Sequence, residues 1–182
     1  CCACGFSKMT VCDRGGAAQA APLHVVLVQP EIPQNTGNIV RTCAVTGAVL
    51  HLVGPLGFSL EDRYLKRAGL DYWHLLDIRR HENLEAFLAQ HGGERLHLLT
   101  AHAARAYHEA TYQPGDYLVF GRETAGLPHD FIRARYADSL RIPMIEGARC
   151  LNLSNAVAIV AYEALRQLGF PNMTFEGRLE EI

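Results

Sequence analysis

Two kinds of apolar pattern alternate along the chain. Short continuous runs rich in leucine and β-branched residues, closed by glycine, proline or a charged residue, are typical of buried strands in a parallel sheet. Such runs predict strands at LHVVLV (23–28), AVLHLVG (48–54), RLHLLT (95–100), DYLVFG (116–121) and SLRIPM (139–144), with a brief further strand at WHLLDI (73–78).

Between these runs, apolar residues recur every three or four positions, which is the period of an amphipathic helix. Asn35 or Thr36 is expected to cap the first helix. Strands that alternate with helices predict an α/β fold, a mostly parallel sheet with helices on both faces. Ligands of such sheets bind beyond the carboxyl ends of the strands, so the loops that follow the strands are the candidate site. The predicted helices span 36–46, 59–69, 81–92, 128–136 and 151–169.

Composition bounds the domain and its partners. The chain has 182 residues, 49% of them apolar and 20% charged, so we expect one globular domain at 23–171. Residues 1–22, rich in Gly and Ala without periodicity, are expected to form a flexible extension, and 172–182 a tail. The net charge is -2, so any surface for nucleic acid must be a local patch. No apolar run approaches the roughly 18 residues of a membrane span, and we expect no membrane contact.

Cysteine usage favours a reducing compartment and thus a cytoplasmic location. Cys43 and Cys150 lie in the body of the chain and are expected to be free thiols. Cys1 and Cys4 form a C-x-x-C pair, but no second pair follows and no histidine precedes His24. Because zinc sites need clustered ligands, we expect no metal and no cluster of metal ligands. Four histidines are expected to be structural or surface residues: His74, His81, His97 and His102.

The loop QPEIPQNTGNIVR (29–41) follows the first predicted strand. It lacks both G-x-G-x-x-G and G-x-x-x-x-G-K-[ST], which excludes a dinucleotide fingerprint and a P-loop at this position. Arg41 then has two interpretations. It is either a solvated helix residue or a guanidinium that grips a phosphate or polarises a hydroxyl.

Two later loops also carry candidate chemistry. In LVFGRETAGLP (118–128), Gly121 and Gly126 bracket Glu123, which indicates either backbone kept bare for a ligand or a tight strand-to-helix turn. In the third loop, three polar residues cluster at the start of the last helix, although one suffices as a cap. They are Asn152, Ser154 and Asn155.

Taken in order, these loops read N-x-G-N-I-x-R, then F-G-x-E-x-x-G-L-P, then I-P-M followed by L-N-L-S-N-A-V. The sequence resembles the SPOUT superfamily of S-adenosylmethionine-dependent RNA methyltransferases over about residues 23–171. It is most similar to the minimal, TrmL-type branch, which methylates the ribose 2′-oxygen of the wobble cytidine or uridine of tRNA. The alternatives are a relative that modifies another tRNA or rRNA site, and a non-catalytic RNA-binding relative.

The resemblance implies a C-terminal deep trefoil knot, a homodimer whose active sites are completed by the partner chain, and S-adenosylmethionine bound among the knotted loops. Arg122 stands where relatives commonly have proline, which is expected to loosen that turn. Cys150 stands where relatives often have serine. The implied cofactor-binding residues are Leu99, Gly121, Glu123, Gly126, Ile142, Cys150, Leu151, Asn152 and Ser154.

The resemblance also implies the catalytic residues Arg41, Glu123, Ser154 and Asn155. Because the pKa of a guanidinium exceeds 12, Arg41 is a poor base. We therefore expect it to bind a phosphate and to stabilise the developing 2′-alkoxide. The tRNA anticodon loop is expected to contact a basic segment near Tyr72 and Trp73, unless that segment is simply a solvated helix face. The expected substrate-binding residues are Asn35, Arg63, Lys66, Arg67 and Tyr162.

Overall fold

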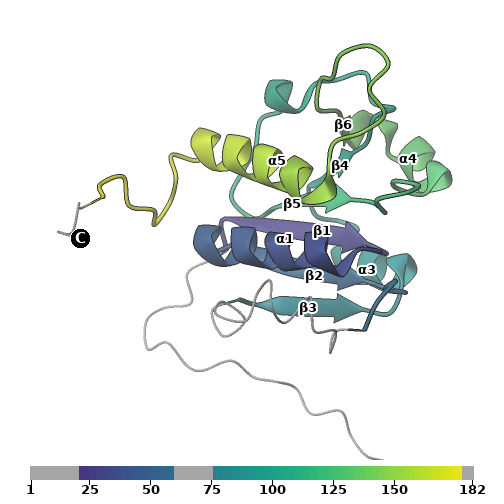
Figure 1. Cartoon of the computed structure of the whole chain (residues 1–182), viewed down its shortest axis with the longest axis horizontal. Coiled ribbons are helices and arrows are strands. Elements are labelled where there is room, and N and C mark those ends of the chain that lie inside the picture. Colours follow the sequence, from purple (N-terminus) through teal and green to yellow (C-terminus); the bar gives the residue numbers. More distant parts are fainter. Residues whose placement is uncertain (1–20, 60–75, 178–182) are drawn as a thin grey trace, which may run out of the picture.

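The computed structural model describes residues 21–59 and 76–177. Strands and helices alternate through most of this length (Figure 1). The first half contains β1 (Leu23–Val28), α1 (Pro33–Thr46), β2 (Val49–Val53), β3 (Ile78–His81) and α3 (Leu84–His91). The second half contains β4 (Leu96–Leu99), the 3₁₀ turn η2 (Tyr107–Glu109), β5 (Asp116–Phe120), α4 (His129–Ala134), the 3₁₀ turn η3 (Tyr136–Asp138), β6 (Ser139–Leu140) and α5 (Leu153–Gln167).

The strands form one six-stranded sheet in the order β3-β2-β1-β5-β4-β6, and every neighbouring pair is parallel. The central strands β1 and β5 pair directly, with Leu27 opposite Phe120 near their carboxyl ends. The chain leaves β1 toward β2 on one side and leaves β5 toward the strands on the other side. The loops after β1 and β5 therefore diverge, which creates a switch point where ligands of such sheets bind.

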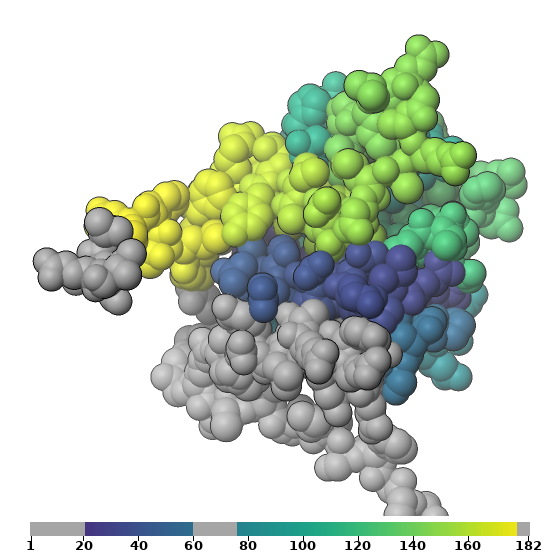
Figure 2. Space-filling view, in the orientation of Figure 1, coloured from purple at the N-terminus to yellow at the C-terminus, as the bar shows by residue number. Residues whose placement is uncertain are grey.

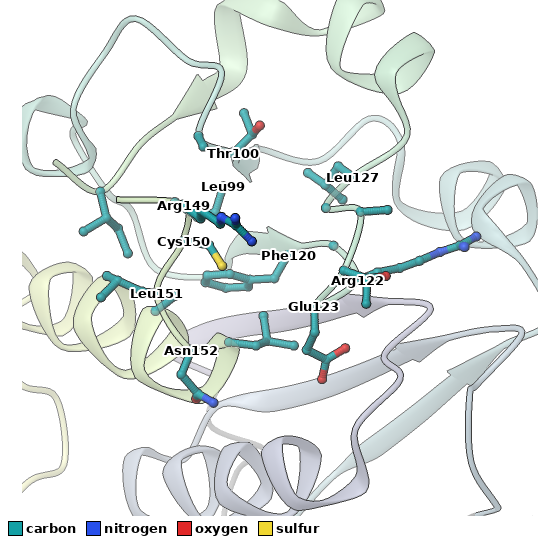
Figure 3. Close-up of a pocket in the computed structure, with 18 of the residues that line it drawn as sticks. Leu99, Thr100, Phe120, Arg122, Glu123, Leu127, Arg149, Cys150, Leu151 and Asn152 are labelled. Carbon is teal, nitrogen blue, oxygen red and sulfur yellow. The ribbon is translucent and has the colours of Figure 1, made fainter. Parts of the chain in front are cut away.

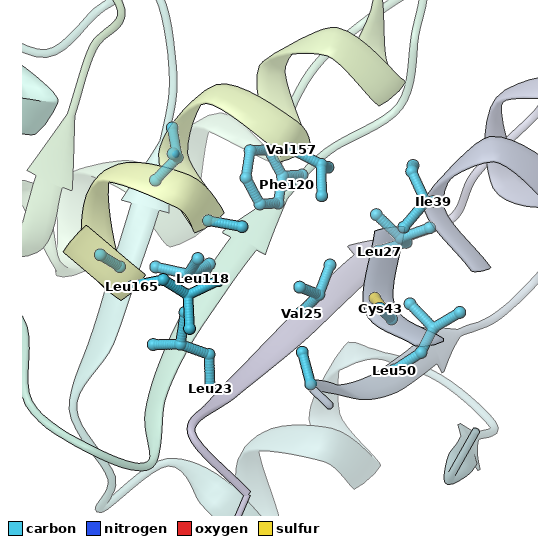
Figure 4. Close-up of a cluster of buried hydrophobic side chains, with 14 of the residues drawn as sticks. Leu23, Val25, Leu27, Ile39, Cys43, Leu50, Leu118, Phe120, Val157 and Leu165 are labelled. Atoms are coloured by element: carbon cyan, nitrogen blue, oxygen red, sulfur yellow. The ribbon is translucent and has the colours of Figure 1, made fainter. Parts of the chain in front are cut away.

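One face of the sheet is covered by α1 and α5, which lie side by side (Figure 1). Leu23, Val25 and Leu27 of β1 point to this face and pack against apolar residues of both helices (Figure 4). Cys43 of α1 is fully buried in this cluster, and burial raises the pKa of its thiol to about 12. Cys43 is therefore a neutral core residue.

The other face is covered by α3 and α4, and its apolar core includes Phe87 of α3 and Phe131 of α4. The predicted α/β fold with helices on both faces is thus confirmed. This face also gathers His51, His81 and His91, which are far apart in the sequence. The expectation that the chain has no cluster of metal ligands is wrong at this point, because the pairing of β2 with β3 and the packing of α3 beside them bring these residues together.

Several element boundaries differ from the sequence prediction. The helix predicted at 81–92 begins only at Leu84, because His81 ends β3. Helix α1 begins at Pro33, so Asn35 and Thr36 lie in its first turn and do not cap it. Strand β3 begins at Ile78, where the predicted strand was expected to end. Strand β6 has only two residues, because Arg141 exchanges backbone hydrogen bonds with residues 105 and 107 rather than with β4.

The predicted helix at 59–69 lies almost entirely outside the described residues. The same is true of most of the predicted extension at residues 1–22 and of most of the basic segment near Tyr72 and Trp73. Over residues 21–59 and 76–177, no helix combines the length and the apolar character that a membrane crossing requires.

Candidate active site at the carboxyl ends of the strands

A cavity of about 510 Å³ opens beyond the carboxyl ends of β4, β5 and β6 (Figure 3). Its walls come from the loops that follow these three strands and from the segment that leads into α5. Apolar side chains such as Leu99, Phe120 and Ile142 form much of the lining, with a few polar groups among them. The volume and this mixture are typical of a small-molecule site.

The loop after β5 passes so close to itself that residue 121 must be a glycine. A Cβ on Gly121 would lie 2.0 Å from the carbonyl carbon of Gly126 and 2.2 Å from the nitrogen of Leu127. Arg122 and Gly126 close the loop with reciprocal backbone hydrogen bonds of 3.1 and 3.0 Å. The N–H of Arg122 donates one of these bonds, which a proline could not, so the turn is closed here despite the arginine.

Glu123 joins this loop to the start of α1. Its carboxylate accepts hydrogen bonds from the backbone N–H of Glu31 (2.8 Å) and Ile32 (3.2 Å), and from the Nδ2 of Asn35 (3.0 Å). The carboxylate therefore caps a helix whose own N-cap residue, Ile32, has no side-chain cap bond. A negative charge at this end is also favoured by the helix dipole. Glu31 reciprocates, since its carboxylate accepts from the Oγ1 of Thr124 at 2.7 Å.

Asn152 caps the start of α5 in the same way. Its Oδ1 accepts from the backbone N–H of Ser154 (3.0 Å) and Asn155 (3.4 Å) and from the Oγ of Ser154 (2.7 Å). Its Nδ2 donates to the Oδ1 of Asn35 at 2.9 Å. Asn35 and Asn152 thus connect the first turns of α1 and α5 and extend the link to Glu123 on one wall of the cavity.

The turn after β1 is conformationally strained. Gln29 has a φ of 53°, in the left-handed region that residues other than glycine rarely adopt. Its N–H donates to the carbonyl of Val53 at 2.7 Å, and its side-chain oxygen accepts from the Arg122 guanidinium. Such strain persists where surrounding contacts over-determine it, and it occurs mainly at functional sites.

Arg41 lies on the outer face of α1, away from the cavity lining. Val45 follows it one turn later and is 50% exposed. The outer face of the adjacent α5 carries Ile159 and Tyr162, which are 36% and 43% exposed. Figure 2 shows α1 and α5 next to one another on the same surface of the molecule. This surface therefore combines a guanidinium with uncovered apolar side chains.

The structure brings most of the expected cofactor residues together. Eight of the nine line the cavity, namely Leu99, Gly121, Glu123, Gly126, Ile142, Cys150, Leu151 and Asn152. Ser154 is the exception, since it is 9% exposed and its hydroxyl is engaged by Asn152. Among the other expected site residues, Asn35 lines the cavity, whereas Asn155 and Tyr162 lie on the exposed face of α5. Arg63, Lys66 and Arg67 lie outside the described residues.

Several lining residues were missed by the sequence analysis. Phe120 ends β5 and Thr100 follows β4, so their positions at strand ends could have indicated them. Arg149 lies directly before Cys150 and contributes a positive charge to the lining (Figure 3). Met144 also lines the cavity, and its place in the I-P-M motif could have indicated it.

The arrangement suits binding and orientation more than proton transfer. The apolar walls can hold a flat or aliphatic group, while the bare backbone of Gly121 permits close approach of a ligand. Glu123 accepts three hydrogen bonds from the protein, and the hydroxyl of Ser154 donates to Asn152, so their geometry is that of positioning residues.

Comparison with known proteins is consistent with this geometry. The model of the SpoU rRNA methylase family matches residues 22–162. The tRNA (cytidine(34)-2′-O)-methyltransferase of Escherichia coli strain K12 is 50% identical over 150 residues, which cover 82% of this chain and 96% of that protein.

Two solved structures have similar folds. One, described by its authors as concerning the 2-OH methylation of C/U34 on tRNA, is 51% identical with a TM-score of 0.77, and the match covers 81% of this chain and 96% of that one. The other is an AdoMet-bound rRNA methyltransferase from Sinorhizobium meliloti, 30% identical with a TM-score of 0.73, and the match covers 82% of this chain and 58% of that one.

Proposed function

The chain belongs to the SpoU rRNA methylase family, and from this premise we propose that it methylates the ribose 2′-hydroxyl of the wobble cytidine or uridine of tRNA, with S-adenosylmethionine as methyl donor. The observation that carries the proposal is the single cavity that collects residues from all three sequence motifs. The similarity to the Escherichia coli enzyme over nearly its full length supports the choice of substrate. Such a function implies a cytoplasmic location, where tRNA is found.

The cavity suits S-adenosylmethionine in size and in chemistry. A volume of about 510 Å³ falls in the range of sites that enclose nucleoside-sized ligands. Leu99, Ile142 and Leu151 offer apolar surfaces for an adenine ring, and Gly121 leaves room for a ligand to approach the backbone. Bound S-adenosylmethionine supplies a methyl group on a sulfonium, which leaves as a neutral thioether.

The protein then has two tasks, to align the ribose oxygen and to stabilise the charge that develops on it. Positioning of reactants can contribute roughly 7–11 kcal/mol in favourable cases. Glu123, Asn35 and Asn152 hold the loops that would position the cofactor. We assign Arg41 to the substrate, where its guanidinium binds the adjacent phosphate and stabilises the 2′-alkoxide.

The position of Arg41 supports a homodimer, because Arg41 lies outside the lining of the cavity in its own chain. The outer faces of α1 and α5 present the partly exposed Val45, Ile159 and Tyr162 beside it. In the proposed homodimer these faces meet, and Arg41 of one protomer completes the cavity of the other. Asn155, on the exposed side of the first turn of α5, would lie near the same junction.

The trefoil knot of the family is also part of the proposal. Two sets of contacts around the loop after β4 support it. Arg141 exchanges backbone hydrogen bonds of 2.9 Å with Arg105 and Tyr107, and Gln167 of α5 donates from Nε2 to the carbonyl of Ala110 at 3.0 Å. The loop after β4 is therefore contacted by Arg141, which precedes the cavity-lining segment 142–156, and by Gln167, which follows it. Tracing residues 100–115 and 141–167 in an experimental electron-density map tests the threading.

The substrate is tested with a pair of synthetic anticodon stem-loops and radiolabelled S-adenosylmethionine. One stem-loop carries an ordinary wobble ribose and the other a 2′-deoxyribose at that nucleotide alone. We expect label only in the first, and digestion should release it as a 2′-O-methylnucleoside. Label that persists on the deoxy stem-loop, or methyl on a base, would overturn the assignment to the ribose oxygen.

A further inference from the structure

Three histidines meet on the α3 face of the sheet, apart from the cavity. His51 lies in β2, His81 ends β3 and His91 ends α3. One ring nitrogen of each lies within 4.8 Å of the others. His51 is fully buried and His81 is 8% exposed, whereas His91 is half-buried and gives access from solvent. No member of this trio lines the cavity of the candidate active site.

Hydrogen bonds link the trio to its neighbours, with the donor and acceptor of each ring pair set by the tautomers. The Nδ1 of His51 lies 2.9 Å from the Nε2 of His81, and the Nε2 of His51 lies 2.9 Å from the Nδ1 of His24. The Nδ1 of His91 lies 3.1 Å from the hydroxyl of Tyr117. Within the described part of the chain, the buried Nδ1 of His81 has no hydrogen-bond partner.

The hydrogen bonds among the described residues therefore leave one nitrogen of this cluster, Nδ1 of His81, without a partner. Each neutral imidazole has one donor and one acceptor, and His81 uses only one of its two nitrogens. A buried polar atom without a partner is costly, so hydrogen bonding alone does not account for the position of the His81 ring.

The local electrostatics keep these rings in the form that binds metals. Burial, reinforced by the neighbouring histidines and Arg79, lowers the pKa of His51 to about 2, and burial also lowers the pKa of His81 and His91. Protons therefore do not compete for the ring nitrogens at neutral pH. Among the nearby charges, Arg79 pairs with Asp77 at 2.8 Å, and the negative charge of Glu94 acts against the lowering of the His91 pKa.

We propose that His51, His81 and His91 form a binding site for Zn²⁺ or a chemically similar divalent transition metal. Three imidazoles with a fourth position open to water make a ligand set that zinc accepts. Ligand nitrogens about 2.0–2.1 Å from a tetrahedral zinc are roughly 3.3 Å apart. The 2.9 Å separation of His51 and His81 thus needs only a small opening of the two rings.

The surrounding hydrogen bonds fit outer-shell roles. Ligating histidines usually donate their other N–H to an acceptor, which sets the tautomer. When His51 binds through Nδ1, its Nε2–H donates to the Nδ1 of His24. When His91 binds through Nε2, its Nδ1–H donates to the Tyr117 hydroxyl. The metal would join the edge strand β3 to β2 and α3, so its role is to stabilise this side of the sheet.

The test uses the full chain with the four cysteines of its first dozen residues changed to serine, so that this N-terminal group of thiols cannot bind the metal. After treatment with a chelator and desalting, Zn²⁺ is titrated by calorimetry and Co²⁺ by visible absorption. We expect one equivalent of Zn²⁺, a tetrahedral Co²⁺ spectrum and a higher thermal midpoint in the presence of Zn²⁺. An anomalous difference peak between the three imidazoles in a Zn²⁺-soaked crystal would locate the ion.

His91→Gln removes the half-buried ligand, and His108→Gln is the matched control on an exposed residue of η2. His91→Gln should weaken Zn²⁺ binding at least about 10-fold and abolish the thermal shift, whereas His108→Gln should leave both unchanged. Circular dichroism verifies that both variants fold. No binding by the parent, equal binding by His91→Gln, or an anomalous peak elsewhere would overturn the proposal.

Discussion

Replacing Glu123 tests whether the cavity depends on the carboxylate that joins the β5–α4 loop to α1. Glu123→Ala removes the acceptor of three hydrogen bonds, from the N–H groups of Glu31 and Ile32 and from the Nδ2 of Asn35. Hydrogen bonds to charged groups contribute about 1.5–3 kcal/mol each, and neutral ones about 0.5–1.5. Because Glu123 is only partly buried and water can replace some of these bonds, we take about 1 kcal/mol each.

The expected loss for Glu123→Ala is therefore about 2–3 kcal/mol of the free energy of unfolding. With a urea m-value of about 1–3 kcal/mol/M, the urea midpoint should fall by about 1 M or more. Glu123→Gln keeps one oxygen but faces its NH₂ toward a backbone donor, so about 1–2 kcal/mol should be lost. Affinity for S-adenosylhomocysteine should fall at least about 10-fold in both variants, because the cavity wall loses its anchor.

Urea unfolding monitored by circular dichroism and calorimetric titration of S-adenosylhomocysteine measure the two effects. Glu176→Gln, on an exposed residue near the end of the described chain, is the matched control and should change neither value. A Glu123→Ala variant with wild-type stability and wild-type affinity would refute the positioning role. Wild-type stability and affinity with lost methyl transfer would instead make Glu123 a catalytic residue.

Three further predictions address other parts of the molecule. Gly121→Ala should unfold or distort the loop, because the added Cβ meets backbone atoms at 2.0–2.3 Å; binding of S-adenosylhomocysteine should be lost by calorimetry, and unaltered binding would contradict the close approach. In the metal-free protein, stability should fall by about 2 kcal/mol from pH 7 to pH 5 on account of His51 alone. Its folded pKa lies near 2, so only the unfolded chain takes up the proton and stability is fully present above pH 6.5; a flat urea midpoint over this range would refute neutral burial. Arg41→Ala should lower the single-turnover rate about 100-fold without altering the urea midpoint or S-adenosylhomocysteine affinity; an unchanged rate would remove Arg41 from the mechanism.

The central strands could be predicted because each is buried on both faces. The ends of β1, β2, β4 and β5 lie within one or two residues of the predicted ends. A strand that is buried on both faces appears in the sequence as a continuous apolar run, which is easy to recognise. The last helix was bounded nearly as well, because Asn152 caps it from the position directly before it.

The errors arose where a distant residue decides a local boundary. Helix α1 begins at Pro33 because Glu123, 88 to 92 residues away, accepts the hydrogen bonds that a local cap would accept. Strand β6 stops at Leu140 because the loop after β4 takes Arg141 as its partner. The histidine trio escaped prediction for the same reason. The β2–β3 register pairs Val53 with His81, which leaves His51 and His81 two positions apart on neighbouring strands, and His91 comes from α3. The two residues of each such contact are too far apart in the sequence for a local pattern to include both.

The sequence predicted the residue types of the candidate site better than the hydrogen bonds between them. Asn35 shows why these residue types are needed. Its amide uses both ends, since Nδ2 donates to the Oε1 of Glu123 while Oδ1 accepts from the Nδ2 of Asn152. An aspartate at this position could not donate to Glu123, and a serine is too short to reach both partners. Asn152 must likewise donate with one end while its oxygen caps α5. The two asparagines and the glutamate therefore form a directed chain in which each donor faces an acceptor, and this requirement, imposed across three loops, accounts for the amide and carboxylate positions of the three motifs.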